Sequence, residues 1–266
     1  MKHDNLINSI GPNNSENIVK KIILQIQDYF KTSNATTAIL GLSGGIDSTL
    51  AAKLCILALG KENVIGVMMP EIGLTKQQNT DDARQFAEKE EIRYLLQPIN
   101  KMLLSYDLNI PINDIAKMNL KARIRANILY SYANTFSNNS NNTSNFNNHN
   151  SLNKSNTLVI GTSNKTEAMV GYGTKYGDLA CDIFVIGDLL KTEVYEISKY
   201  LQIQESILTK VPTAELCEGQ TDEQELGIKY TELDAQLKSG NLSKEIEERV
   251  KKNEHKRKYP FVVKVH

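Results

Sequence analysis

The residues of this chain with the clearest chemistry lie in one short segment, 41–48, which reads Gly-Leu-Ser-Gly-Gly-Ile-Asp-Ser. An apolar stretch precedes it and apolar residues at helical spacing follow it, so the segment is predicted to join a strand to a helix. Gly44 and Gly45 let the backbone approach an anion, and the free N–H groups of a helix start carry partial positive charge. Ser43 and Ser48 add two hydroxyl donors. The segment therefore predicts a phosphate site, and we call it the phosphate loop.

Asp47 is the exception in this loop, because a carboxylate repels a bare phosphate. A bridging Mg²⁺ removes the conflict, since this ion binds carboxylates and phosphates together. The alternative is that the serines and Asp47 only cap an ordinary helix, where an acid in the first turn is favoured by the helix dipole. A cap does not need two adjacent glycines, and the loop lacks the Lys-Ser/Thr pair of a Walker A motif. The phosphate interpretation is favoured.

The pattern around the loop predicts alternating strands and helices. Helices are expected at 16–31, from the phosphate loop to Gly60, at 75–90 and at 112–135, and strands before the loop and at 64–69, 94–96 and 158–160. Residues 221–254 are charged and helical in character. This alternation is typical of an α/β fold, here a Rossmann-like doubly wound parallel sheet with helices on both faces. Ligands of such folds collect at the carboxyl ends of the strands.

Composition narrows the class of protein. The 266 residues include 31 basic and 31 acidic side chains, so a net charge of zero argues against a nucleic-acid partner. Three widely spaced cysteines predict neither disulfides nor a zinc knuckle, and they fit a reducing cytoplasm. The polar N-terminus and the lack of a long apolar run predict no signal peptide and no membrane partner. One domain, 1–266, is expected.

Residues 137–156 interrupt the pattern. Ten of these twenty residues are Asn and five are Ser, with only two apolar side chains among them. Such a segment cannot bury enough apolar surface to order itself. A disordered low-complexity loop within the domain is predicted.

Further along the chain, four segments narrow the interpretation of the phosphate loop. The loop itself resembles Ser-Gly-Gly-x-Asp-Ser of the ATP-pyrophosphatase (N-type adenine nucleotide α-hydrolase) superfamily. Residues 119–125, 161–182, 211–227 and 255–257 resemble, in order, motifs of ammonia-dependent NAD⁺ synthetases. Ile46 departs from that pattern, in which Gln is frequent. The resemblance runs from about residue 18 to 260.

The resemblance implies an ATP-dependent ligase. The family adenylates the nicotinate carboxylate of deamido-NAD⁺ with ATP and Mg²⁺, and ammonia then displaces AMP from the NAD-adenylate to give NAD⁺, the last step of NAD biosynthesis. It also implies a homodimer, to which the 112–135 helix would contribute. The sequence shows no glutaminase region, so free ammonia is expected as the nitrogen donor unless a separate chain delivers it.

The same resemblance assigns residues to the site. It implies ATP contacts from Gly41, Leu42, Ser43, Gly44, Gly45, Ile46, Asp47, Ser48, Thr162, Lys191 and Thr213. It gives Asp47 and Glu167 to Mg²⁺, and catalysis to Asp47, Lys191 and Asp178. It implies deamido-NAD⁺ contacts from Arg123, Lys175, Asp182, His255 and Lys256.

Several of these residues have a second interpretation. Asp178 either attracts ammonium and takes its proton or only forms a turn after Gly177. Arg125 either shares the work of Arg123 or only pairs on a helix surface. The basic residues around His255 either fold over the dinucleotide or form a solvated tail.

Two other functions are open to a chain with this loop. A guanylate- or transfer-RNA-modifying enzyme would need a glutaminase partner or a basic RNA-binding surface, and the sequence shows neither. An ATP sensor that does not turn ATP over would not need the paired acids Asp47 and Glu167.

Overall fold

A five-stranded parallel sheet forms the centre of the computed structural model, which describes residues 12–137, 156–213, 215–217, 219 and 221–265. The strands are β1 (Ala35–Gly41), β2 (Val64–Met68), β3 (Arg93–Leu96), β4 (Asn156–Gly161) and β5 (Ile183–Phe184). Their order is β3-β2-β1-β4-β5, so the chain runs from the centre to one edge and returns to the other side of β1. Between β1 and β4 the winding reverses, which opens a crevice beyond the carboxyl ends of these strands.

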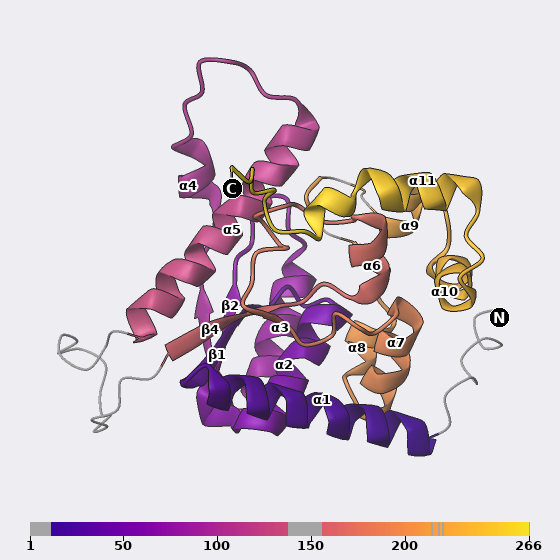
Figure 1. Ribbon diagram of the computed structural model, residues 1–266. Helices are drawn as coiled ribbons and strands as arrows, with labels where there is room; N and C mark the ends of the chain where they lie inside the picture. The colour runs from indigo at the N-terminus through magenta and orange to yellow at the C-terminus, as the bar shows by residue number, and fades with distance from the viewer. Residues whose placement is uncertain (1–11, 138–155, 214, 218, 220, 266) are drawn as a thin grey trace.

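Helices connect the strands and cover both faces of the sheet (Figure 1). They are α1 (Pro12–Thr32), α2 (Ile46–Leu59), α3 (Gln77–Lys89), α4 (Asn100–Leu104), α5 (Asp114–Ser137), α6 (Lys165–Val170), α7 (Lys191–Tyr200), α8 (Glu205–Leu208), α9 (Asp222–Leu226), α10 (Tyr230–Ser239) and α11 (Lys244–Lys252).

Side chains along β1 point alternately to the two faces of the sheet, so the core has two layers. Leu40 packs with α1, α2, α3 and α7 on one face, whereas Ile39 packs with α4 and α5 on the other. A third apolar cluster lies apart from the sheet, between α6, α9, α10 and α11, and contains Leu233 and Ile246. Burial on both faces explains why the central strands read as continuous apolar runs.

The architecture confirms the predicted fold class. The expected helices and strands are present with ends shifted by a few residues, and Gly60 ends α2 as expected. The pattern did not predict α4, α7, α8 or β5, which are short or of mixed polarity, and residues 221–254, expected to be helical in character, form three helices. The single-domain assignment stays a prediction.

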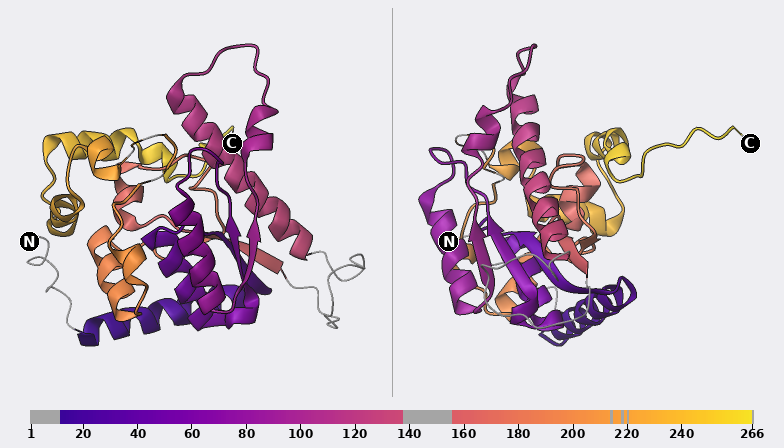
Figure 2. Two further views of the ribbon diagram at one scale, coloured as in Figure 1. Left: turned by 180° about the vertical axis from the view of Figure 1, so that it is seen from behind. Right: turned by 90° about the vertical axis from the view of Figure 1, so that its left-hand side faces the viewer.

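The Asn-rich segment lies almost entirely outside the described residues. Its flanks are close together, because the Thr157 backbone N–H donates to Ser137 Oγ at 2.8 Å. At the other end of the chain, residues 259–265 extend away from the body in the right-hand view of Figure 2. Of the helices within the described residues, none is long and apolar enough to cross a bilayer.

Candidate active site

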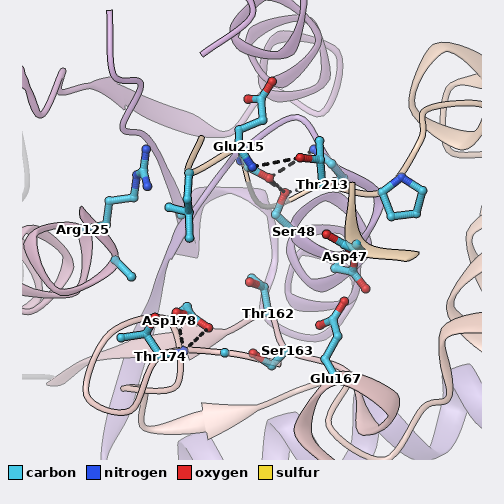
Figure 3. A pocket seen from close by; sticks show the side chains of 18 of the residues that line it. Asp47, Ser48, Arg125, Thr162, Ser163, Glu167, Thr174, Asp178, Thr213 and Glu215 are labelled. Carbon is cyan, nitrogen blue, oxygen red and sulfur yellow. Dashed lines mark hydrogen bonds between the residues drawn. The ribbon is translucent and has the colours of Figure 1, made fainter. Parts of the chain in front are cut away.

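A cavity of about 790 Å³ opens beyond the carboxyl ends of β1, β2 and β4. The phosphate loop and Glu167 line one side of it, and Arg125 and Asp178 line the opposite side (Figure 3). Thr213 approaches the phosphate loop from a third segment. The cavity therefore lies at the switch point that the alternating pattern predicted.

The phosphate loop has the conformation that its glycines suggested. Gly44 has φ +77°, and a Cβ there would lie 2.1 Å from the Asn79 carbonyl oxygen, so only glycine fits. The hydroxyl oxygens of Ser43 and Ser48 lie 3.1 Å apart, and Ser48 Oγ also donates to the Gly45 carbonyl at 3.0 Å. No side chain described here caps Gly45 at the start of α2. The first N–H groups of α2 are thus open to a ligand, which argues against a purely capping role.

Lys191 joins the two acids that the sequence assigned to a metal. Its ammonium lies 2.6 Å from Asp47 Oδ2 and 3.0 Å from Glu167 Oε1, and its side chain is almost completely buried. Asn164 Nδ2 donates to the other oxygen of Asp47 at 2.9 Å. Asp47, Glu167 and Lys191, which we call the acid–lysine cluster, come from the first turns of three different helices.

Opposing effects set the charges of this cluster. Burial and the charge of Asp47 together raise the pKa of Glu167 to about 7, against the attraction of Lys191. Burial alone would lower the pKa of Lys191, but Asp47 and Glu167 outweigh it and hold the pKa above its ordinary value. The lysine therefore stays an ammonium throughout the physiological range.

A third acid, Asp222, lies close enough to the acid–lysine cluster for its charge to act on Lys191. Asp222 is buried and accepts hydrogen bonds from the hydroxyl groups of Tyr172 and Tyr230, each at 2.9 Å. Burial raises the pKa of Asp222, and the attraction of Lys191 opposes the rise. Sequence reasoning gave no role to Asp222, although it lies within the 211–227 motif, or to Tyr230, which lies outside every motif.

The opposite side of the cavity contains Arg125 rather than Arg123. Arg125 donates from Nε to the Met69 carbonyl at 3.1 Å, and burial lowers its pKa. Arg123 is exposed and lies outside the described cavity lining. Arg125 therefore faces the cavity, as expected of a residue that contacts a ligand, and does not pair with neighbours on the solvent-exposed surface of α5.

Asp178 also faces this side of the cavity. It accepts two hydrogen bonds from the Thr174 backbone N–H, at 2.9 and 3.2 Å, so it closes a turn as the second interpretation proposed. The protein atoms around the carboxyl raise its pKa, although one side of it is open to the cavity. Asp178 thus closes a turn at the cavity wall, and its part in catalysis stays a prediction.

The remaining residues assigned to deamido-NAD⁺ are Lys175, Asp182, His255 and Lys256, which we call the rim residues; all but Lys256 lie outside the described cavity lining. Asp182 is exposed and accepts from the Val159 N–H at 2.7 Å, while Lys175 donates to the His255 carbonyl at 2.7 Å. Lys256 alone of this group lines the cavity, where its ammonium donates to the Gly171 and Gly173 carbonyls. One chain does not bring these residues together around a common point, and their assignment stays a prediction.

The segment that carries Thr213 is tied to the phosphate loop by Lys210. The Lys210 ammonium lies 2.6 Å from Asp82 Oδ2 and donates to the Gly44 carbonyl at 2.9 Å. The Glu215 N–H donates to Thr213 Oγ1 at 3.1 Å. Thr162 and Thr213 both line the cavity, and their contacts with ATP stay a prediction. Lys210 lines it too, and no sequence signal pointed to it.

Fold and site together define a nucleotide-binding α/β protein, in which a glycine-rich loop and a buried ion cluster meet at the topological switch point. The family model for NAD synthase matches residues 18–260, and the chain belongs to this family. The expected resemblance is therefore confirmed.

Two relatives and two solved structures place the chain within the family. It is similar to the NH₃-dependent NAD⁺ synthetase of Methanocaldococcus jannaschii (42% identical, 92% of this chain and 95% of the relative) and to that of Methanococcus aeolicus (44%, 88% and 87%). The NMN synthetase structure from Francisella tularensis matches with a TM-score of 0.78, at 30% identity over 94% of this chain and 98% of that one. An NH₃-dependent NAD synthetase structure from Campylobacter jejuni matches with a TM-score of 0.71, at 32% identity over 94% and 99%.

Proposed function

We propose that this chain makes NAD⁺ from deamido-NAD⁺, ATP and ammonia. In the first step a nicotinate carboxylate oxygen attacks the α-phosphorus of ATP, and the bond to pyrophosphate breaks. In the second step ammonia attacks the carbonyl carbon, loses a proton and displaces AMP. The observation that carries the proposal is the acid–lysine cluster facing the open helix start of the phosphate loop within one cavity.

The phosphate loop and Lys191 suit the first step. Negative charge grows on the bridging oxygen as pyrophosphate leaves, and stabilising it requires fixed donors and positive charge in a water-poor site. The open N–H groups of α2 supply donors, and the hydroxyl groups of Ser43 and Ser48, which now bond to each other and to the Gly45 carbonyl, can join them by turning toward the phosphate. Lys191 supplies a permanent positive charge that needs no proton transfer.

Mg²⁺ belongs to the proposal, and the residues present fit it. Asp47 and Glu167 offer carboxylate oxygens, the ligand type that Mg²⁺ prefers, and both point into the cavity (Figure 3). Within the described residues no group of three or more acids, histidines or cysteines is arranged to hold a metal ion by itself, so substrate phosphates and water would complete the coordination. When bound, the ion would neutralise phosphate charge and help pyrophosphate leave.

Two features support a homodimer. Arg123, Asp182 and His255 are exposed on one chain although the resemblance gives them to the substrate, so a second copy is the simplest way to complete that site. In α5, Ile115 is 66% exposed, which suits a helix that packs on another chain. Sedimentation of the purified chain tests this, and a monomer at enzyme concentrations that support full activity would refute it.

Ammonia is the proposed nitrogen donor, and the cysteines support this choice. Burial raises the pKa of Cys55 and that of Cys181 to about 12, so neither is a ready thiolate nucleophile of the kind that glutamine hydrolysis uses. The three cysteines, all described, form no disulfide, which also supports the reducing cytoplasm as the compartment.

The decisive experiment supplies the purified chain with ATP, Mg²⁺ and deamido-NAD⁺, and either ammonium or glutamine, and measures AMP and NAD⁺. We expect both products with ammonium only. Replacing all three cysteines by Ser should preserve the ammonium reaction per folded molecule. Product from glutamine in ammonia-free buffer, lost in the cysteine-free variant, would contradict the assignment.

A second candidate is amidation of the mononucleotide counterpart. The observation that favours it is the TM-score of 0.78 to the structure titled as an NMN synthetase. Running the same assay with nicotinate mononucleotide separates the two. We expect deamido-NAD⁺ to give the higher kcat/KM, and the reverse order would reassign the substrate.

A further inference from the structure

The helix α10 contacts Lys191 at both ends of the lysine. Tyr230 and Asp234 are one turn apart on α10 and therefore project from the same face of it. The Lys191 ammonium lies over the Tyr230 ring, 5.0 Å from its centroid. Asp234 lies at the other end, where the backbone of Lys191 begins α7. One short helix thus holds the ammonium and the main chain of the same residue.

The hydrogen bonds at the backbone end form a relay. The Lys191 N–H donates to Thr166 Oγ1 at 2.9 Å, and the Thr166 hydroxyl donates to Asp234 Oδ1 at 2.5 Å. The Thr192 N–H donates to the other Asp234 oxygen at 2.8 Å. Thr166 and Asp234 are both buried. The first N–H groups of α7 are therefore satisfied by α6 and α10 and not by the helix's own N-cap residue.

That N-cap residue explains why outside partners are needed. Residue 190 is a leucine, which has no side-chain oxygen to accept from the first N–H groups. A buried carboxylate at a helix N-terminus is favourable, because it meets the positive end of the helix dipole. Asp234 thus fixes where α7 starts, and with it the root of the Lys191 side chain.

The ammonium end is fixed by a second set of bonds. The Tyr230 hydroxyl donates to Asp222 at 2.9 Å and lies 3.5 Å from Glu167 Oε1. Asp222 also accepts from Tyr172, so the tyrosine ring cannot turn without breaking a buried network. A ring held in this way keeps one face against the ammonium.

We propose that α10 is a positioning element for Lys191, with Asp234 acting through Thr166 on its backbone and Tyr230 acting on its ammonium. This inference rests on the proposed function, in which Lys191 stabilises charge on the departing pyrophosphate. Neither residue is expected to touch substrate. Replacing them should change kcat more than KM. A displaced ammonium stabilises the transition state less, and the transition state is where the negative charge on the leaving pyrophosphate develops.

The test compares kcat and KM for AMP formation among Asp234→Asn, Tyr230→Phe and Thr166→Val. Each should lower kcat, by about 10-fold for Asp234→Asn and Thr166→Val, which is the order of one lost hydrogen bond to a charged group. Thr166→Ser keeps the hydroxyl and should retain activity. The double variant Thr166→Val with Asp234→Asn should lose no more than either single variant, because both cut the same relay.

Two controls separate positioning from general loss of structure. Ile246→Ala removes core volume from the same apolar cluster without contact to Lys191, so it should lower the melting temperature and leave kcat per folded molecule unchanged. In a Lys191→Met background, Asp234→Asn and Tyr230→Phe should cost nothing further. Equal losses with and without the lysine would overturn the inference.

The outcomes also separate this inference from the proposed function. If Lys191→Met turned over like the wild type, the proposed role of the lysine would fail. If Lys191→Met were inactive while Asp234→Asn and Thr166→Val kept full kcat, only the role of α10 would fail. Should Lys191→Met not fold, additive losses in the Thr166 and Asp234 pair would be enough to reject the relay.

Discussion

Two groups of candidate site residues, the phosphate side and the rim residues, differ in how far a single chain completes them. The phosphate side, made of the phosphate loop and the acid–lysine cluster, buries its charges and gives each a partner within the chain. The rim residues Lys175, Asp182 and His255, by contrast, lie outside the described cavity lining and are partly or fully exposed, and their partners are mostly backbone atoms. The phosphate side is preorganised in one chain, whereas the rim leaves its charged groups open to a further surface or ligand.

The contrast indicates which step each side serves. Preorganised charge is most useful where charge changes during a reaction, which here is the departure of pyrophosphate. Exposed polar groups suit the recognition of a large substrate, whose own hydroxyl and phosphate groups complete the hydrogen bonds. Variants on the two sides should therefore differ in kind as well as in size.

The largest effect is expected for Asp47→Asn. Losing this charge should lower the rate of AMP formation by about 10²–10³, the usual effect of removing one contact that stabilises transition-state charge. Steady-state assays at saturating substrates and ordinary Mg²⁺ measure it. Asp188→Asn, which removes a highly exposed surface acid, should leave the rate unchanged. Wild-type turnover in Asp47→Asn would remove Asp47 from the mechanism.

Asp82→Asn tests how much the buried ion pair between Asp82 and Lys210, which also bonds to the phosphate loop, contributes to stability. Burial alone would raise the pKa of Asp82, but hydrogen bonds from Lys210, Gln78 and Ser206 outweigh it and hold the pKa below its ordinary value of 3.8. The variant should lower the free energy of unfolding by about 2–3 kcal/mol at neutral pH, the range for hydrogen bonds to a charged group.

The pH dependence of that loss follows from the lowered pKa. The carboxylate stabilises the fold fully above its unfolded pKa, and the contribution disappears as pH falls through the lower folded pKa. Urea unfolding at neutral and acid pH should therefore show wild type and Asp82→Asn converging in acid. The neighbouring partly exposed Asp81, changed to Asn, should cost less than about 0.5 kcal/mol. If the difference in unfolding free energy between wild type and Asp82→Asn grew in acid, the pKa of Asp82 would be raised in the folded protein and not lowered.

On the rim, Lys175→Ala and Asp182→Ala should weaken deamido-NAD⁺ binding by about 10-fold and leave ATP binding unchanged, which matches the loss of one charged hydrogen bond. Titrating each nucleotide separately by calorimetry measures both effects. An equal loss for the two ligands would mean that these residues support the fold and do not recognise the dinucleotide.

The smallest effect is expected from deleting residues 138–155 and joining the ends by a short Gly-Ser link. Ser137 and Thr157 are already hydrogen-bonded, so a short link can span them. Halving a flexible loop changes closure entropy by only about 0.6 kcal/mol. Melting temperature and turnover should stay nearly unchanged, and a marked loss of either would show that the segment packs against the rest of the protein or a second copy.

Features that depend on neighbouring residues in the chain could be predicted from the sequence, whereas features that depend on contacts between distant segments could not. The positive φ of Gly44 could be expected from the glycines of the loop alone, whereas its close approach to the Asn79 carbonyl is visible only in the fold. Strands and helices with strong periodicity were readable for the same reason. Lys210 and Tyr230 were not, because their roles depend on contacts with residues distant in the chain.

The same reason explains the outcome for the arginines and for Lys191. Arg123 and Arg125 lie two positions apart on α5, so they point to different sides, and only the packing of the helix shows that Arg125 faces the cavity. The resemblance gave Lys191 to phosphate, but its pairing with Asp47, 144 residues earlier, is visible only in the fold.

The strand order has a consequence for the way the chain folds. Residues 35–96 hold β1, β2 and β3, which pair as near neighbours in sequence, whereas β1 meets β4 only when Ala35 pairs with Asn156. Contacts between distant segments form late, because the long intervening chain must first be closed. During synthesis, the phosphate loop exists before the ribosome has made Glu167 or Lys191. Asp47 therefore faces water, without its counter-ion, until the second half of the sheet docks, and assembly of the buried ion cluster is a late event of folding.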